Sequence, residues 1–222
     1  MVRVLSVSAR STRRYNKPLR VIVFTWEFPP RVVGELASRV NREVNRLCES
    51  GVSVDVITIS DSGYLIEEPS PRLRVTRINS PVSPHSTIIT WLAALNVEFA
   101  RVAADIYHST PETPILHSHD WHFAPAAATL KNALGVPWAL TIHSLEVHRS
   151  ITPNSPLSLC ISTIEKEMSR ECDAIFVASS YMRDEVLKNT PADPGKVVLI
   201  PPEEPDWSKE VLKIYRSLVV SR

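Results

Sequence analysis

Residues 20–34, RVIVFTWEFPPRVVG, decide the fold class of this chain of 222 residues. The first seven of them, 20–26, are almost wholly apolar and rich in β-branched side chains, which is typical of a strand covered on both faces in a parallel sheet. Two adjacent prolines cannot continue a strand ladder, so residues 27–34 are predicted to form a loop. Apolar residues then recur at helical spacing, which predicts a helix over residues 35–50. Strand, loop and helix in this order indicate an α/β protein.

The same alternation continues along the chain. Further strands are predicted over residues 52–59, 73–78, 115–117, 138–142, 174–177 and 197–200. Further helices are predicted over residues 86–104, 123–134, 157–170, 181–188 and 209–218. Strands that alternate with helices imply right-handed crossovers, and so a doubly wound, Rossmann-like parallel sheet. In such sheets ligands bind beyond the carboxyl ends of the strands, which directs attention to the loops that follow them.

The composition excludes several classes of protein. Hydrophobic residues make up 44% and charged residues 22%, which is typical of a soluble globular domain. The sequence contains neither a long apolar span nor a cleavable leader, so we expect a cytoplasmic protein without a membrane partner. A net charge of +1 argues against a nucleic-acid partner. The 5 glycines form neither GxGxxG nor a Walker loop, which argues against the usual dinucleotide and nucleoside triphosphate sites. The absence of glutamine and the excess of arginine over lysine favour a thermophilic source.

Polar side chains are dense after the strand that ends near residue 117. Residues 117–122, HSHDWH, hold three histidines and one carboxylate, a density that is often found at zinc sites. Metal-dependent hydrolases of the metallo-β-lactamase type use HxHxDH, whereas the order here is HxHDxH. An alternative role for Asp120 is that of an ordinary N-cap for the helix that follows.

Two other loops carry candidate binding groups. Gly34 lies at the start of a predicted helix, where free backbone N–H groups and the helix dipole favour an anion such as phosphate. His143 and Ser144 follow the strand predicted over residues 138–142. The alternative for His143 is a structural role in the core.

Four ordered motifs carry a resemblance to a known family. They are residues 24–34 together with 47–56, residues 117–121 with 124–126, residues 140–144, and residues 173–180. This set resembles glycogen and starch synthases and related retaining glycosyltransferases. The resemblance implies the N-terminal, acceptor-side half of a GT-B fold, an architecture of two Rossmann-like domains with the active site in the cleft between them.

The resemblance also implies roles for individual residues. His143 matches the histidine beside the transferred sugar, and Asp120 matches an acid in the same cleft, so both are expected to be catalytic. The expected substrate-binding residues are Gly34, Glu35, His119, Trp121 and Ser144, although packing is the alternative for Trp121. The reaction implied is metal-independent transfer of glucose with retention of configuration, and preorganised dipoles would stabilise the departing diphosphate. No cofactor is expected, and the donor substrate would be a nucleotide sugar such as ADP-glucose or UDP-glucose.

The sequence departs from the family pattern in ways that bear on function. Glu35 replaces the second glycine of a pair, so a carboxylate would face an incoming phosphate. The chain ends at Arg222, before the C-terminal domain that supplies the family's diphosphate contacts. We therefore expect a basic N-terminal extension over residues 1–19, a Rossmann-like domain over 20–205, and a linker helix over 206–222 that starts an absent domain.

These departures leave functions of different classes open. The chain is either a glycosyltransferase half that acts with a C-terminal domain or subunit on a glucan acceptor, or a non-catalytic remnant that binds a glycan or a partner. A metal-dependent hydrolase that uses the HxHDxH cluster is a more distant alternative. On any of these hypotheses Gly34, Asp120 and His143 are expected to border one concave surface, since all three follow the carboxyl ends of strands.

Overall fold

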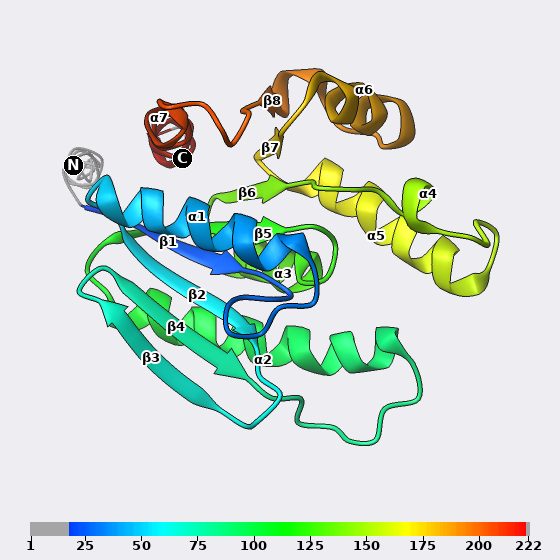
Figure 1. Ribbon diagram of the computed structural model, residues 1–222, viewed down its shortest axis with the longest axis horizontal. Helices are drawn as coiled ribbons and strands as arrows, with labels where there is room; N and C mark the ends of the chain where they lie inside the picture. Colours follow the sequence, from blue (N-terminus) through cyan, green and yellow to red (C-terminus); the bar gives the residue numbers. More distant parts are fainter. Residues whose placement is uncertain (1–17, 221–222) are drawn as a thin grey trace, which may run out of the picture.

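A computed structural model of the protein describes residues 18–220. The strands are β1 (Leu19–Phe24), β2 (Ser53–Ile59), β3 (Leu65–Ser70), β4 (Leu73–Ile78), β5 (Thr113–His119), β6 (Trp138–Thr141), β7 (Ala174–Val177) and β8 (Val197–Leu199). The helices are α1 (Glu35–Glu49), α2 (Ile88–Ser109), α3 (Ala124–Leu134), α4 (Glu146–Arg149), α5 (Pro156–Glu171), α6 (Ser180–Asn189) and α7 (Trp207–Val220), with a 3-10 turn, η2 (Pro194–Lys196). The α/β fold expected from the sequence is confirmed (Figure 1).

One sheet of eight strands organises the fold, in the order β3-β4-β2-β1-β5-β6-β7-β8. All neighbouring strands pair in parallel except β3, which pairs antiparallel with β4 at the edge. The strand order reverses at β1, which lies between β2 and β5, so the carboxyl ends of β1 and β5 form the switch point of a doubly wound sheet. Strand β3 and the short helix α4 were not expected from the sequence.

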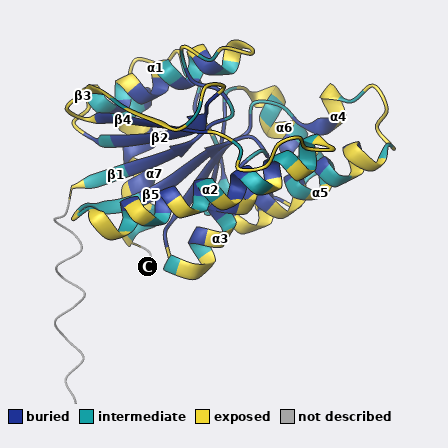
Figure 2. Ribbon diagram, turned by 90° about the horizontal axis from the view of Figure 1, so that it is seen from below, coloured by how far each residue is buried: buried dark blue, intermediate teal, exposed yellow. Residues whose placement is uncertain are grey.

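Two apolar layers sandwich the sheet, as Figure 2 shows by the buried strands between more exposed helices. On one face of the sheet, Val21 and Val23 of β1 pack against α1 and α7. On the other face, Ile22 and Phe24 pack against α2 and α3. This alternation arises because successive side chains of a strand point to opposite faces. Burial on both faces explains why the strands are apolar throughout.

Helix α7 packs on the same face of the sheet as α1. Trp207, Val211, Leu212 and Tyr215 of α7 are buried in the same apolar cluster as Val21 of β1. The segment expected as a linker helix is thus helical and forms part of the described core. The basic extension expected over residues 1–19 lies almost wholly outside the described residues.

None of the helices formed by residues 18–220 is long and apolar enough to cross a membrane. The three cysteines, Cys48, Cys160 and Cys172, are free thiols.

Candidate active site at the carboxyl ends of the strands

Asp120 connects the ends of two neighbouring strands. It follows β5 directly, and its Oδ1 accepts a hydrogen bond from the backbone N–H of His143 at 2.8 Å and a longer one from Ser144 at 3.4 Å. Its own N–H donates to the carbonyl of Thr141 at 2.9 Å. Asp120 is 6% exposed and has a φ of 53°, a left-handed conformation that aspartate tolerates better than most residues.

This geometry corrects the helix-cap alternative for Asp120. The N-cap of α3 is Phe123, which makes no side-chain cap hydrogen bond. The carboxylate instead turns toward β6, because the left-handed residue redirects the chain immediately after β5. Asp120 therefore fixes the position of the loop that carries His143.

His143 and His119 form a hydrogen-bonded pair of stacked rings at this edge. The Nε2 atom of His143 lies 3.0 Å from Nδ1 of His119, and its Nδ1 lies 3.2 Å from Nη1 of Arg39. A guanidinium can only donate, so Nδ1 of His143 accepts and Nε2 carries the proton given to His119. Burial lowers the pKa of His143 and places that of His119 well below its usual value. Both rings are therefore neutral near pH 7.

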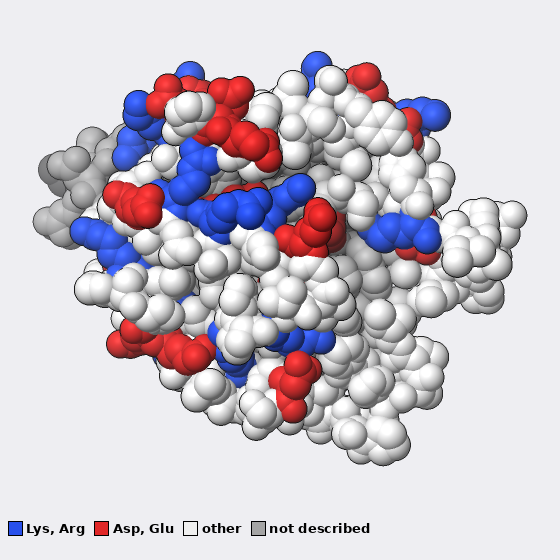
Figure 3. Space-filling model, in the orientation of Figure 1, with Lys and Arg blue, Asp and Glu red and all other residues white. Residues whose placement is uncertain are grey.

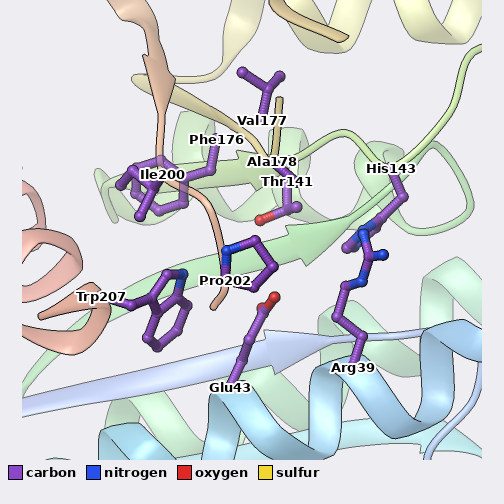
Figure 4. Close-up of a pocket in the computed structure, with 10 residues that line it drawn as sticks. All are labelled: Arg39, Glu43, Thr141, His143, Phe176, Val177, Ala178, Ile200, Pro202 and Trp207. Atoms are coloured by element: carbon purple, nitrogen blue, oxygen red, sulfur yellow. The ribbon is translucent and has the colours of Figure 1, made fainter. Parts of the chain in front are cut away.

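Arg39 projects from α1 toward this pair, so one helix supplies a cation to the edge formed by β5 and β6 (Figure 4). His143 is half-buried and stays reachable from solvent, whereas His119 is only 1% exposed. His143 is thus the more exposed residue of the pair, and His119 and Arg39 hold its ring in one tautomer.

A second histidine on the same strand face serves packing. The Nδ1 atom of His117 lies 2.6 Å from the phenol oxygen of Tyr215 on α7, and its Nε2 lies 2.7 Å from Oγ1 of Thr141. Burial lowers the pKa of His117 to about 3 and raises that of Tyr215 well above its usual value. This neutral chain of hydrogen bonds attaches α7 to the centre of the sheet.

A buried carboxylate that was not expected from the sequence holds the loop between β1 and α1. Glu27 is 3% exposed, and its Oε2 accepts hydrogen bonds from the backbone N–H groups of Val33 and Gly34, the latter at 2.8 Å. Glu35, the expected obstacle to phosphate, begins α1 and is exposed. The two N–H groups that precede the helix thus already bind an anion from within the chain.

A small cavity lies beneath His143, between α1 and the ends of β6 and β7. Figure 4 shows Arg39 and Glu43 entering it from α1, with Thr141, Pro202 and Trp207 around them. About 20 Å³ is open to the centre of a water molecule, which suffices for a single water. Burial raises the pKa of Glu43 to about 7. A ligand much larger than a single water molecule does not fit this space.

Glu165 and Arg149 stabilise the loop that carries His143 and Ser144. Both carboxylate oxygens of Glu165 on α5 accept from the N–H of Glu146, at 2.8 and 3.0 Å, and Oε1 pairs with Arg149 at 2.7 Å. Arg149 in turn donates to the carbonyl and the hydroxyl of Ser144. Glu165 and Arg149 therefore act as positioning residues for the edge.

The structure brings some of the expected site residues together and separates others. Asp120, His143, Ser144 and His119 meet at one edge. Trp121 is 5% exposed and packs in the apolar core. Gly34 lies at the same edge of the sheet, but neither Gly34 nor Asp120 lines the cavity that His143 borders.

Besides Glu27, several residues at or beside the site were not expected from the sequence. Glu43 falls in the buried stripe of α1 with Val40, Val44 and Leu47, so a charge at an apolar position was a readable signal. Arg39 lies one helical turn before it. Tyr215 could not be found from the pattern, because its partner His117 is 98 residues away.

The cluster at residues 117–122 does not form a set of metal ligands. Among residues 18–220, no three His, Cys, Asp or Glu side chains gather as they do around a bound ion. His117 turns to Tyr215 and His119 turns to His143, which leaves the HxHDxH hydrolase hypothesis without a ligand set in the described chain.

The fold and the edge geometry can be compared with those of known proteins. The sequence is 29% identical over 184 residues to an uncharacterized glycosyltransferase of Methanocaldococcus jannaschii, covering 81% of this chain and 45% of that protein. It is 26% identical over 186 residues to a glycogen synthase of Mycobacterium tuberculosis, covering 77% of this chain and 44% of the enzyme. The chain thus spans less than half the length of these relatives.

A solved structure of sucrose-phosphate synthase from Thermosynechococcus elongatus has the same fold. It superposes with a TM-score of 0.68 at 18% identity, and the match covers 82% of this chain and 48% of that one. The fold and the sequence matches define an N-terminal, Rossmann-like half of a GT-B glycosyltransferase. The chain belongs to the family of glycosyl transferase 4-like domains, whose profile matches residues 34–203.

Proposed function

We propose that this chain is the acceptor-side half of a retaining glycosyltransferase, which transfers glucose from a nucleotide sugar such as ADP-glucose or UDP-glucose to a glucan. The main support for this proposal is the environment of His143. Contacts with Asp120, His119 and Arg39 hold this residue, neutral and half-buried, at the carboxyl end of β6. A neutral imidazole at a sheet edge can bind a sugar hydroxyl without adding charge beside an oxocarbenium-like transition state.

Asp120 and His143 would carry the chemistry, each in a different way. His143 would contact the transferred sugar. Asp120 has its Oδ1 engaged by backbone N–H groups, so its contribution to catalysis is the placement of His143. His119 and Ser144 would complete the contacts around the sugar, and Gly34 would border the diphosphate.

Arg39 adds a route by which donor binding prepares His143. A diphosphate is a stronger partner for a guanidinium than a neutral imidazole, so a bound donor would draw Arg39 away from Nδ1. The freed nitrogen would then accept a hydrogen bond from a sugar hydroxyl. No metal ion or cofactor takes part in this scheme.

Catalysis on this proposal requires a C-terminal domain or subunit that closes the cleft. The support is that the relatives are about twice as long as this chain, and that the cavity under His143 holds no more than a water molecule. Half of the contacts to a transition state would come from the second domain. The proposal includes the cytoplasmic location expected from the sequence.

A chimera tests this function. Residues 1–222, which include the core helix α7, are joined to the part of the Mycobacterium tuberculosis glycogen synthase that this chain does not match, and glucose transfer from labelled ADP-glucose and UDP-glucose to glycogen is measured. We expect transfer that falls at least a hundredfold in His143→Ala and is little changed in the matched exposed-residue control His108→Ala. A folded, active chimera that tolerates His143→Ala would contradict the proposal.

A non-catalytic binding protein is the second candidate, and Glu35 is the observation that favours it. Its exposed carboxylate at the start of α1 repels an anion that approaches the helix N-terminus. If this charge limits donor binding, Glu35→Gly should tighten ADP or UDP binding about threefold to tenfold by calorimetry. If neither the wild-type chain nor Glu35→Gly binds a nucleotide, and both bind a glycan, the non-catalytic alternative is favoured.

A further inference from the structure

A cluster of aromatic side chains lies at the same sheet edge, beside the candidate active site. Trp26 follows β1 and His122 follows β5, and because these strands are neighbours their rings meet at 4.7 Å between centroids. Trp91, in the first turn of α2, meets Trp26 edge to face at 5.2 Å. His85 stacks on Trp91 at 5.1 Å with 14° between the ring planes.

These two tryptophans differ from the other three of the chain. Trp121, Trp138 and Trp207 are at most 5% exposed and lie in the core. Trp26 and Trp91 are half-buried, and His85 is exposed. An indole that stays partly in water at a functional edge offers a flat apolar face with a polar N–H, which is a recognised composition of a binding surface.

The surroundings of the cluster carry few charged groups. Residues 78–97 contain no Lys, Arg, Asp or Glu, and Figure 3 shows a largely uncharged surface over the 79–87 loop and the start of α2. Charged groups near the cluster are the guanidinium of Arg31, which lies 5.3 Å from the Trp26 ring centroid and is paired with Asp61, and the side chains of Asp120 and Arg149, which act on His122 with opposite sign. A neutral ligand with apolar C–H faces fits this surface better than an ionic one.

The cluster is held rigidly. The side chain of Thr87 caps α2 by accepting from the N–H of Thr90 at 3.2 Å. Asn96, on the same helix, donates to the carbonyl of His122 at 2.9 Å and accepts from the N–H of Ala126 at 2.8 Å. Helix α2 is thus tied to the loop that follows β5, and a ligand that stacks there would meet preorganised rings.

One polar atom in the cluster lacks a partner. Nδ1 of His122 is buried and has no hydrogen-bond partner among the described residues. An unsatisfied buried nitrogen is unfavourable in free energy, and a ligand hydroxyl that reached it would remove that penalty. His122 is also two residues from Asp120, so the cluster adjoins the edge that carries His143.

We propose that Trp91, with Trp26 and His122 beside it, forms a stacking site for a pyranose ring of a neutral α-glucan. The C–H groups on one face of a pyranose pack on an aromatic ring, while the hydroxyls at the ring's rim hydrogen-bond to neighbouring polar atoms. His85 occupies the Trp91 face as a sugar ring would, and because it comes from an exposed loop a sugar can exchange with it. Placement of this glucan as the acceptor rests on the proposed function, whereas the binding itself does not.

Affinity electrophoresis of the full chain in native gels that contain glycogen tests the site, because it needs neither donor nor catalysis. We expect retardation by glycogen that free maltoheptaose reverses. Trp91→Ala should weaken the apparent affinity at least tenfold, and Trp91→Phe should retain part of it. Tyr107→Ala is the matched control, since it removes a half-buried ring from the far end of the same helix and should leave the affinity unchanged.

His85→Ala tests the exchange step, because removal of the competing ring should tighten binding about twofold to threefold. Unchanged or weaker binding would overturn that step. Absence of retardation, or equal retardation of wild type and folded Trp91→Ala, would overturn the site. If the chain does not bind glycogen but the chimera transfers glucose, the glucan site is wrong and the proposed function is kept. If the chain binds glycogen through Trp91 but the chimera transfers no glucose, the glucan site is kept and the proposed function is wrong.

Discussion

The Asp120 carboxylate and the His143 backbone N–H are joined at 2.8 Å, and this contact links the carboxyl ends of β5 and β6. Both residues follow strands in the middle of the sheet, and each contributes a different part to the bond. The side chain of one fixes the backbone of the other, so the position of the imidazole depends on a residue 23 places earlier in the sequence.

Two replacements of Asp120 should differ in their effect on stability, because only one of them keeps a hydrogen-bond acceptor. Asp120→Ala removes the acceptor and also the short polar side chain that makes the left-handed conformation tolerable, so we expect a loss of about 3 kcal/mol in the free energy of unfolding. Asp120→Asn keeps an acceptor and should cost about 1 kcal/mol. Urea denaturation measures both. Asp105→Asn, at an exposed position of α2, is the control, and equal losses for all three variants would refute the role of Asp120.

Glu27 is expected to stabilise the chain far more than Glu35. Glu27→Ala leaves two backbone N–H groups near α1 without their acceptor, so we expect a loss of about 2–3 kcal/mol in the free energy of unfolding. Glu35 is exposed, and Glu35→Ala should have little effect. Thermal denaturation of the two variants compares them directly. A larger shift in melting temperature for Glu35→Ala would show that the loop is held in another way.

The bond between Tyr215 and His117 should hold α7 against the sheet. Tyr215→Phe preserves the ring but leaves Nδ1 of a buried histidine without its partner, which should cost about 1–2 kcal/mol. Tyr181→Phe, at a position that is 62% exposed, is the matched control and should be neutral. Hydrogen exchange should become faster along α7 in the first variant. Exchange that rises uniformly over the whole chain would contradict a local role.

The buried histidines should make the protein sensitive to acid. Burial lowers the pKa of His117 to about 3 and that of His122 to about 4, while an unfolded histidine titrates near 6.5. The stability that they contribute is therefore present above pH 6.5 and is lost as the pH falls toward these values. Glu43 acts in the opposite sense, because burial raises its pKa to about 7 and its protonated form is favoured in the folded state.

Urea titrations at pH 6.5 and pH 5 measure this balance. We expect a net loss of about 2–4 kcal/mol over that interval. Glu43→Gln should make the loss of stability larger, and His117→Asn should make it smaller. Each variant changes the difference in bound protons between the folded and unfolded states by about one. Equal stability at both pH values would show that these histidines are protonated in the folded protein.

The helices and buried strands could be predicted because apolar periodicity determines them. The strand over residues 73–78 and that over 174–177 were predicted with the bounds of β4 and β7. β3 was missed because its sequence, LIEEPS, alternates poorly and contains a proline, which an edge strand tolerates. α4 has only four residues, too few for a helical period to show.

The location of the candidate site could be predicted from the sequence, but most of its hydrogen bonds could not. Placement of His143 and Asp120 after neighbouring strands followed from the pattern and from the family resemblance. The role of Asp120 depends on a left-handed backbone angle that no sequence period reveals. Glu27 looked like an ordinary loop residue, because its partners are backbone N–H groups that carry no sequence signature.

Glucose transfer by the isolated chain distinguishes half of a glycosyltransferase from a complete one. The chain is incubated with labelled ADP-glucose or UDP-glucose and glycogen, beside the chimera that adds a donor-side domain. We expect transfer by the chimera and none above background by the isolated chain, because on the proposed function a second domain makes part of the contacts to the transition state. Turnover near about 1 per second by the isolated chain, a usual enzymatic rate, would contradict the claim that it is half of a catalyst.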